Sequence, residues 1–249
     1  MLKRNVLITG GGKRLGAAIA RAAAGAGWRV VIHYGRSANA ARALAEELGG
    51  VTVQGDLADT ADAAALFARA RHAAGGPIAA LVNSASSFEY DRPEAIDPAL
   101  AARLHAINAV APAMLAAELA GQDDVEGGVV VNLLDQKLAN PNPDFFSYSL
   151  SKYALAGATE MLAQALAPRV RINAVAPGIT LPSGDQSDAE FAAVAADNLL
   201  RRPVGAENVA EAVIFLLNAR SVTGQTLYVD CGQRFVKRDG DVMFEGRHG

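Results

Sequence analysis

The sequence predicts an α/β fold in which a doubly wound parallel sheet carries helices on both faces. Short β-branched runs alternate with longer Ala-rich segments of helical period along the chain, which is the pattern of repeated β-α units. Strands such as Val129-Val130-Val131 are continuously apolar, as strands covered on both faces must be. No linker, low-complexity tract or internal repeat interrupts the 249 residues, so we expect one domain over 1–249 that includes a C-terminal tail, 234–249.

The alternation fixes the expected order of the elements. Strands are expected at 5–9, 28–33, 50–54, 79–83, 128–134, 169–175 and 225–229. Helices are expected at 14–26, 37–49, 60–75, 97–120, 147–167 and 206–218, with a shorter one at 188–199. The carboxyl ends of parallel strands meet at one edge of the sheet, where open α/β sheets bind their ligands.

Charge and composition argue against several classes of partner. The net charge is −3 without any basic or acidic block, so nothing predicts binding to nucleic acid or to a membrane surface. The first apolar run begins within a few residues of Met1, too early for a signal peptide, and no apolar run approaches the ~18 residues of a transmembrane span. The single cysteine, Cys231, fits a structural role in a reducing compartment. We expect a cytoplasmic protein, and the spacing of the four histidines predicts no metal site.

The first strand leads into a glycine-rich turn, Thr9-Gly10-Gly11-Gly12-Lys13-Arg14-Leu15-Gly16. Glycines at this point allow positive φ and a close approach of the backbone to a ligand. The helix that follows offers free N–H groups to a pyrophosphate. A tight turn without a ligand is the alternative. We favour dinucleotide binding, with these candidate residues: Gly10, Gly12, Lys13, Arg14 and Leu15.

The end of the second strand indicates which dinucleotide would bind. An acidic residue there would accept hydrogen bonds from the adenosine ribose of NAD, but this chain has His33-Tyr34-Gly35-Arg36-Ser37. Arg36 can pair with a 2′-phosphate and Ser37 can donate to it at a helix start. The stretch therefore predicts NADP(H), with His33, Tyr34, Arg36 and Ser37 as candidates. The alternative is that Arg36 is a solvated surface charge.

Further candidates follow the other strands. Cofactor contacts are expected from Asp56, Leu57, Asn83, Ser84, Ala85, Ser86, Leu133, Pro177, Gly178 and Ile179. Phe88 is apolar in a polar loop, so its ring either offers a stacking face to a flat substrate or is tucked into the core. Thr180 to Asp188 has the polar, Gly/Pro-bearing composition of a mobile substrate lid.

Tyr148 and Lys152 are four residues apart at the start of an Ala-rich helix, so their side chains lie on one face, one turn apart. A neighbouring ammonium lowers the pKa of a phenol, which makes Tyr148 a candidate general acid or base. A tyrosine four residues before a lysine also occurs by chance on solvated helices. Asn108 is a poor helix former in an apolar helical setting, which indicates a hydrogen bond or a local kink.

Together these residues resemble the short-chain dehydrogenase/reductase family, and the resemblance runs from Thr9 to about Gly232. It depends on the glycine turn, Asp56, the Asn83 segment, Asn108, Tyr148 with Lys152, Pro177-Gly178, and Val229-Asp230-Cys231-Gly232. The resemblance implies a Rossmann fold with strand order 3-2-1-4-5-6-7 and a nicotinamide cofactor. It also implies that Tyr148 donates a proton, that Lys152 lowers the pKa of Tyr148 and holds the nicotinamide ribose, and that Asn108 supports a relay water.

Three departures from the common pattern of the family point to one branch. Arg14 replaces a third glycine, Asn83-Ser84-Ala85-Ser86 replaces Asn-Asn-Ala-Gly, and Asp135 replaces a serine thirteen residues before the tyrosine. This set is similar to pteridine reductases and their bacterial dihydromonapterin-reducing relatives. The similarity implies that Arg14 and Ser86 contact cofactor phosphate and pterin, that Phe88 stacks on the pterin, and that Asp135 and Tyr148 deliver protons.

Three functions stay open from the sequence. The first is NADPH-dependent reduction of a dihydropterin or biopterin-like ring, the second is reduction of a ketone, aldehyde or keto ester, and the third is a non-catalytic NADP sensor. The tail, 234–249, either closes the site, packs on a neighbouring subunit or is loosely ordered. We also expect a homo-oligomer, a tetramer by the family resemblance, packed through the helices at 97–120 and 147–167.

Overall fold

The structure, a computed structural model, describes residues 4–182, 187–241 and 244, and within them the expected sheet is confirmed. Seven parallel strands pair in the order β3-β2-β1-β4-β5-β6-β7. They are β1 (Asn5–Thr9), β2 (Arg29–Tyr34), β3 (Val51–Gln54), β4 (Ile78–Asn83), β5 (Gly128–Leu133), β6 (Val170–Pro177) and β7 (Thr226–Val229). The order reverses between β1 and β4, so the carboxyl ends of these two strands open the crevice in which such sheets bind ligands.

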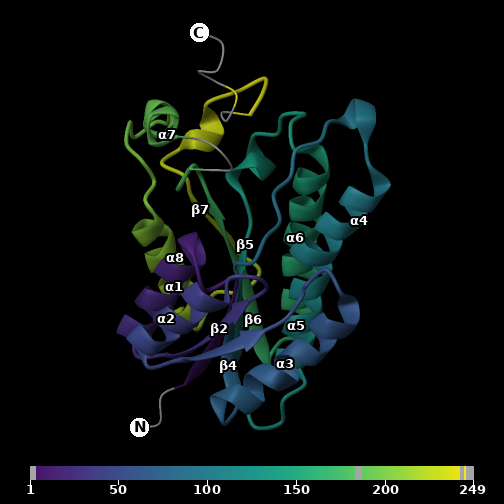
Figure 1. Ribbon diagram of the computed structural model, residues 1–249, viewed down its shortest axis with the longest axis vertical. Coiled ribbons are helices and arrows are strands. Elements are labelled where there is room, and N and C mark those ends of the chain that lie inside the picture. The colour runs from purple at the N-terminus through teal and green to yellow at the C-terminus, as the bar shows by residue number, and fades with distance from the viewer. Residues whose placement is uncertain (1–3, 183–186, 242–243, 245–249) are drawn as a thin grey trace.

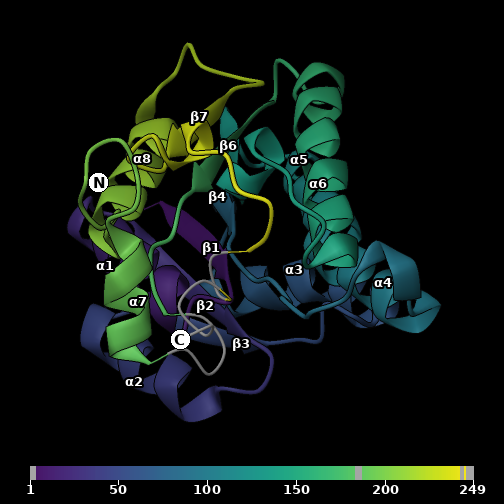
Figure 2. The same ribbon diagram turned by 90° about the horizontal axis from the view of Figure 1, so that it is seen from above.

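Helices cover both faces of this sheet (Figures 1 and 2). One face carries α1 (Arg14–Gly25), α2 (Ala38–Leu48) and α8 (Ala206–Asn218), whose apolar side chains pack with those of the strands in one core. The other face carries α3 (Thr60–Ala74), α5 (Ala111–Ala120) and α6 (Phe146–Ala165), which build a second core. This two-faced burial explains why the strands are continuously apolar.

Local sequence signals account for several helix ends. Asp59 caps α3 by accepting from the N–H groups of Ala61 and Asp62, and Gly75 ends that helix in the left-handed conformation. Ser187 and Glu190 form a reciprocal capping box at the start of α7 (Asp188–Ala195), which lies above the carboxyl edge of the sheet in Figure 1. The helix expected at 188–199 begins where predicted but ends at Ala195, four residues earlier than expected.

The long helix expected at 97–120 is interrupted. It consists of α4 (Pro98–His105), a π-helical turn η2 (Ala106–Val110) and α5, so the irregularity expected at Asn108 is found there. By length and composition alone, Pro98–Ala120 could cross a membrane, which corrects the expectation that no stretch approaches that length. Core helices pass the same test, and α5 buries Leu115 and Leu119 in the core with α3.

Three short 3-10 turns were not predicted. They are η1 (Pro93–Ala95), η3 (Gln136–Ala139) and η4 (Gln233–Phe235). The turns η3 and η4 pack against each other at the carboxyl edge of the sheet. Through them the chain that follows β5 meets the chain that follows β7.

Candidate active site

A cleft of about 1270 Å³ opens at the carboxyl edge of the sheet. It is lined by most of the predicted site residues, which are Gly10, Lys13, Arg14, Leu15, His33, Arg36, Asp56, Leu57, Ser84, Ala85, Ser86, Phe88, Leu133, Asp135, Tyr148, Lys152, Pro177, Gly178 and Ile179. Residues that are far apart in sequence thus meet in one cavity, which is larger than the ~300–1,000 Å³ of an ordinary small-molecule pocket. Within the expected lid, Thr180 and Leu181 line the cleft, whereas residues 183–186 lie outside the described residues.

Five predicted residues lie behind the lining rather than in it. Gly12 faces α2, where an added Cβ would lie 3.0 Å from the Ala41 Cβ. Tyr34 and Asn83 are buried, and the Asn83 amide donates to Asn132 Oδ1 at 2.8 Å. Ser37 is half-buried at the N-cap of α2 without a side-chain capping bond. The fifth, Asn108, is described below.

The glycine turn is shaped by close backbone contacts. Gly10 has φ of +62°, and a Cβ there would lie 2.9 Å from the Ala85 Cα. At Gly16 a Cβ would lie 2.3 Å from the Gly10 carbonyl oxygen. Arg14 stands where the family commonly has glycine and adopts φ of +52°, a conformation that costs a non-glycine residue energy. The turn therefore keeps the glycine-like shape while it adds a guanidinium to the cleft.

His33, on strand β2, supports the glycine turn through a hydrogen bond. The Gly10 N–H donates to His33 Nδ1 at 3.1 Å, and His33 Nε2 contacts the Gly55 carbonyl oxygen at 3.1 Å. Burial lowers the pKa of the imidazole, so the neutral ring accepts at Nδ1 and donates at Nε2. Both ring nitrogens bond protein groups, which makes His33 a brace for the glycine turn. Arg36, two residues past the strand, is exposed at the cleft.

One wall of the cleft carries a polar group of three side chains, Asp135, Tyr148 and Lys152. The Tyr148 hydroxyl donates to Asp135 Oδ2 at 2.8 Å, and the Lys137 N–H orients the other carboxylate oxygen at 2.8 Å. The Lys152 ammonium donates to the Leu133 carbonyl oxygen at 2.8 Å and lies 5.7 Å from the centroid of the Tyr148 ring. Tyr148 and Lys152 share one face of α6, as their spacing predicts.

The direction expected for the pKa of Tyr148 is wrong in this arrangement. Burial, followed by the charge of Asp135, raises the pKa of the phenol well above its ordinary value. Burial also raises the pKa of the Asp135 carboxyl and lowers that of Lys152 to about 8. The sequence revealed the nearby ammonium, but it did not reveal the carboxylate in contact with the phenol or the depth of burial. Tyr148 is therefore a protonated phenol near neutral pH.

Asn108 connects the strand-β4 loop to α6 from the π-helical turn. Its Oδ1 accepts from the Ser86 hydroxyl at 3.1 Å and the Ser87 N–H at 2.9 Å, while its amide donates to the Ser87 carbonyl and the Ser151 hydroxyl, both at 2.9 Å. The side chain is fully buried. Asn108 thus positions Ser86 and the first turns of α6, and a role in a proton relay stays a prediction.

Phe88 lies in the cleft and not in the core. Its side chain is 38% exposed, stacks on Phe145 with ring centroids 4.0 Å apart, and meets the Tyr148 ring edge-on at 4.7 Å. Tyr90 and Phe244 also contact Phe145, at 5.3 and 6.0 Å. These rings (Phe88, Tyr90, Phe145, Tyr148 and Phe244) form an aromatic cluster that lines one end of the cleft.

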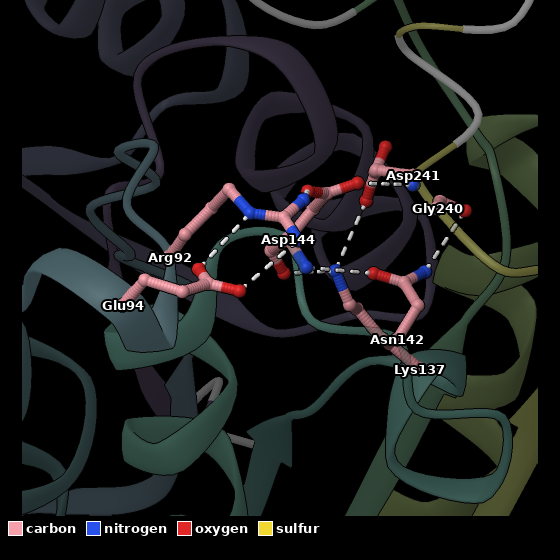
Figure 3. Close-up of polar contacts among 7 residues, drawn as sticks. All are labelled: Arg92, Glu94, Lys137, Asn142, Asp144, Gly240 and Asp241. Carbon is pink, nitrogen blue, oxygen red and sulfur yellow. Dashed lines mark hydrogen bonds and ion pairs between the residues drawn. The ribbon is translucent and has the colours of Figure 1, made fainter.

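Of the three alternatives left open for the C-terminal tail, closure of the site agrees with the structure, because Arg238, Asp241 and Phe244 line the cleft. The contact of the tail with the residues after Asp135 was not predicted. Asn140 donates to the Val236 carbonyl at 2.6 Å, and Asn142 donates to the Gly240 carbonyl at 3.1 Å. Figure 3 shows Lys137, Asn142 and Asp144 around Gly240 and Asp241. The signal in the sequence was a set of apolar residues among charges, Phe235, Val242, Met243 and Phe244, of which Val242 and Met243 lie outside the described residues.

The donor set at the other end suits a nicotinamide dinucleotide. The buried Gln233 accepts from the Ile179 N–H at 2.8 Å, while its own Nε2 has no partner among the described residues. Gly178 lies so close to Asp230 that a Cβ would be 2.9 Å from the Asp230 Cα. An acceptor such as a carboxamide oxygen therefore has the unpaired Gln233 donor to meet. Among the residues in the described ranges, no group of His, Cys, Asp and Glu side chains could hold a metal ion.

Comparisons with known proteins agree with this geometry. Residues 12–234 match the family model described as enoyl-(acyl carrier protein) reductase. Pteridine reductase 1 of Leishmania tarentolae is 33% identical, over 91% of this chain and 94% of that protein.

Two solved structures are also similar. The FolM alternative dihydrofolate reductase 1 of Brucella suis in complex with NADP is 40% identical with a TM-score of 0.89, covering 94% of this chain and 96% of that one. The angucycline C-6 ketoreductase LanV with bound NADP is 26% identical with a TM-score of 0.82, covering 93% and 96%. Matches of this extent, to a family model and to chains with the same fold, show that the protein belongs to the short-chain dehydrogenase/reductase family of oxidoreductases.

Proposed function

We propose that the protein is an NADPH-dependent reductase of a pterin, a dihydropterin or biopterin-like ring. The observation that carries the proposal is the Tyr148 hydroxyl on Asp135 at 2.8 Å, in a cleft that the partly exposed Phe88 ring also lines. A carboxylate beside the phenol suits reduction of a nitrogen heterocycle, because it accepts from ring N–H groups, whereas a neutral hydroxyl would suit a carbonyl. The similarity to pteridine reductase 1 and to a FolM protein supports the same substrate class.

The cofactor half of the cleft has a place for each part of NADPH. The N–H groups of the glycine turn and the start of α1 would hold the pyrophosphate. Arg36, exposed beyond β2, would pair with the 2′-phosphate. Lys152 would hold the nicotinamide ribose, and Ile179 with Gln233 would meet the carboxamide. When bound, NADPH supplies the hydride.

Tyr148 would provide the proton. Hydride adds to a ring carbon of a C=N bond, and the adjacent ring nitrogen takes the phenol proton, so one bond is reduced and the phenolate remains. The high pKa of Tyr148 keeps that proton in place until the substrate arrives. The Lys152 ammonium then stabilises the phenolate. Asp135, whose own pKa burial raises, can relay the proton that restores the phenol.

Reduction of a ketone, aldehyde or keto ester is the second candidate. The similarity to LanV, a ketoreductase, favours it. In this reaction Tyr148 would protonate the carbonyl oxygen, and Asp135 would polarise it only in its protonated form. A non-catalytic NADP sensor has no use for a buried Tyr148, Asp135 and Lys152 set, so we rank it last.

The experiment that tests the proposal follows NADPH oxidation at 340 nm. Dihydrobiopterin and dihydromonapterin are compared with a panel of ketones and aldehydes. We expect turnover with the pterins, and turnover confined to carbonyls would select the second candidate. Tight NADPH binding without any turnover would select the sensor.

We further propose a cytoplasmic homotetramer. Leu150, Tyr153 and Met161 are exposed along α6, and Gly157 on the same helix has open space at its Cβ position. A small-residue helix face with exposed apolar neighbours suits helix packing between subunits. Sedimentation velocity at micromolar concentration should give a tetramer, and a stable monomer would contradict the proposal.

A further inference from the structure

The substrate end of the cleft is closed by the chain's own C-terminal segment. Asp241 lines the cleft together with Gln136, Lys137 and the catalytic pair of Asp135 and Tyr148. Asp241 and Lys137 are 104 residues apart in sequence, yet Lys137 Nζ lies 3.2 Å from Asp241 Oδ2 (Figure 3). The tail thus adds a carboxylate to the part of the site where the substrate would lie.

Asp241 is held firmly in this place. Its backbone N–H donates to Asp144 Oδ2 at 2.8 Å, and Asp144 Oδ1 accepts from Arg92 at 2.7 Å. The Lys137 ammonium also donates to the Asp144 carbonyl oxygen at 2.5 Å. Because three separate segments fix the Asp241 backbone and its ion pair, the carboxylate is preorganised and not a loose end of the chain.

The Asp241–Lys137 pair adds little net stability, because its side chains are only 16% and 6% exposed and burying an ion pair costs about as much as its attraction returns. Removing Asp241 alone would nevertheless leave the buried Lys137 ammonium without its carboxylate, so the pair has a structural use. Phe244, three residues later, also anchors the tail by packing against Tyr90 and Phe145. Because the Asp241 carboxylate lines the cleft as well, it is placed where a polar ligand could meet it.

Gln136 supplies a second, independent sign of such a ligand. Its Oε1 is buried and has no hydrogen-bond partner in the part of the chain that the structure describes. Buried side-chain acceptors are nearly always paired, so this oxygen lacks a donor that the ligand would bring. Gln136 directly follows Asp135 and lines the same cleft as Asp241.

We propose that Asp241 and Gln136 form a specificity subsite that accepts hydrogen bonds from the amino and N–H edge of a 2-amino-4-oxo ring. Lys137, beside the Asp241 carboxylate, donates to the 4-oxo group of the same edge. Carboxylate, amide oxygen and ammonium thus match the two donors and one acceptor of that edge. This inference rests on the proposed pterin reduction and names the part of the ring that the protein recognises.

The electrostatics place Asp241 near the reacting atoms. The charge of Asp241 contributes to the raised pKa values of both Asp135 and Tyr148. A ring with its amino edge on Asp241 can therefore present another edge to the Tyr148 hydroxyl. Recognition and proton delivery would then act on one flat ligand within the aromatic cluster.

The test measures ligand binding without turnover. Protein saturated with NADP+ is titrated with an oxidised pterin and with the same ring lacking the 2-amino group, and ligand fluorescence reports both dissociation constants. We expect Asp241→Asn to weaken pterin binding about tenfold or more, the loss of a charge-assisted hydrogen bond, and to change binding of the deaminated ring less than about twofold. Gln136→Leu should shift the same ratio in the same direction.

Controls keep the outcomes separate. Asp239→Asn removes the same charge from an exposed position of the tail that does not line the cleft, so it should leave both constants unaltered. Equal weakening of both ligands by Asp241→Asn, or an equal effect of Asp239→Asn, would overturn the inference. If Asp241→Asn does not fold, Gln136→Leu alone decides through the ratio. Wild-type protein that reduces no dihydropterin refutes the proposed function, whereas wild-type turnover with an unaltered ratio in both variants refutes only the subsite.

Discussion

The two halves of the cleft are built in different ways. The cofactor half consists of strand ends, with the glycine turn after β1, Arg36 after β2, Ser86 after β4 and Gly178 after β6. The substrate half joins residues 136–145 to the tail, through hydrogen bonds between residues 96 and 98 positions apart. The position of a strand end is set by the pairing of the whole sheet. The position of the tail depends instead on a few individual long-range hydrogen bonds. The difference separates a half that is constrained by the fold from a half that is free to vary with the substrate.

The largest expected effect is at the boundary between the halves. Tyr148→Phe removes the proton donor while the ring keeps its place beside Phe88, so kcat should fall by about 10²–10⁴-fold, with NADPH binding unaltered. Steady-state turnover and NADPH fluorescence measure the two quantities. Tyr153→Phe, an exposed position on the same helix, is the matched control. Retention of wild-type kcat in Tyr148→Phe would refute the assignment of the proton donor.

The second largest expected effect is a change in cofactor preference, which concerns the cofactor half alone. Arg36→Ala removes the cation expected to meet the 2′-phosphate, so the preference for NADPH over NADH should fall by about 10–100-fold. Ratios of kcat/KM for the two cofactors give this number. Arg42→Ala, an exposed arginine on α2, should leave the ratio unaltered. An unchanged ratio in Arg36→Ala would contradict the 2′-phosphate role and favour the alternative that Arg36 is a solvated surface charge.

A pH profile sharpens the comparison at Lys152. Its pKa of about 8 means that the ammonium is present below that pH and lost above it. Since the neutral amine cannot stabilise the phenolate left by Tyr148, kcat/KM for NADPH, which reports on the free enzyme, should fall about tenfold per pH unit above about 8. A profile that stays flat up to pH 10 would show that the charge of Lys152 is not needed.

The smallest effect concerns the substrate half. Asn140→Ala deletes the hydrogen bond to the Val236 carbonyl, so the free energy of unfolding should drop by about 1 kcal/mol. Urea denaturation measures it, and hydrogen exchange should report faster opening at 236–241. Unchanged exchange in that segment would show that Asn140 does not hold the tail. NADPH affinity should not move, because the cofactor half lacks this contact.

Much of the fold and the cofactor half could be predicted from the sequence by itself. Apolar runs alternating with Ala-rich helices determine a parallel sheet, and Gly10, Arg36 and Tyr148 with Lys152 are local signals at strand or helix ends. Their positions follow from the sheet because parallel strands bring their carboxyl ends together. The strand order 3-2-1-4-5-6-7 was implied by the resemblance of these motifs to the family, and the sheet confirms it.

Only the tertiary structure decided the chemical state and the closure of the site. Spacing along one helix showed that Lys152 is near Tyr148, but the direction of the phenol's pKa depends on burial and on Asp135 in contact with it. The tail residues Asp241 and Phe244 carry no local motif, and their place depends on partners about a hundred residues away. Local pattern determines elements and their ends, whereas desolvation and long-range contacts arise only when the elements pack.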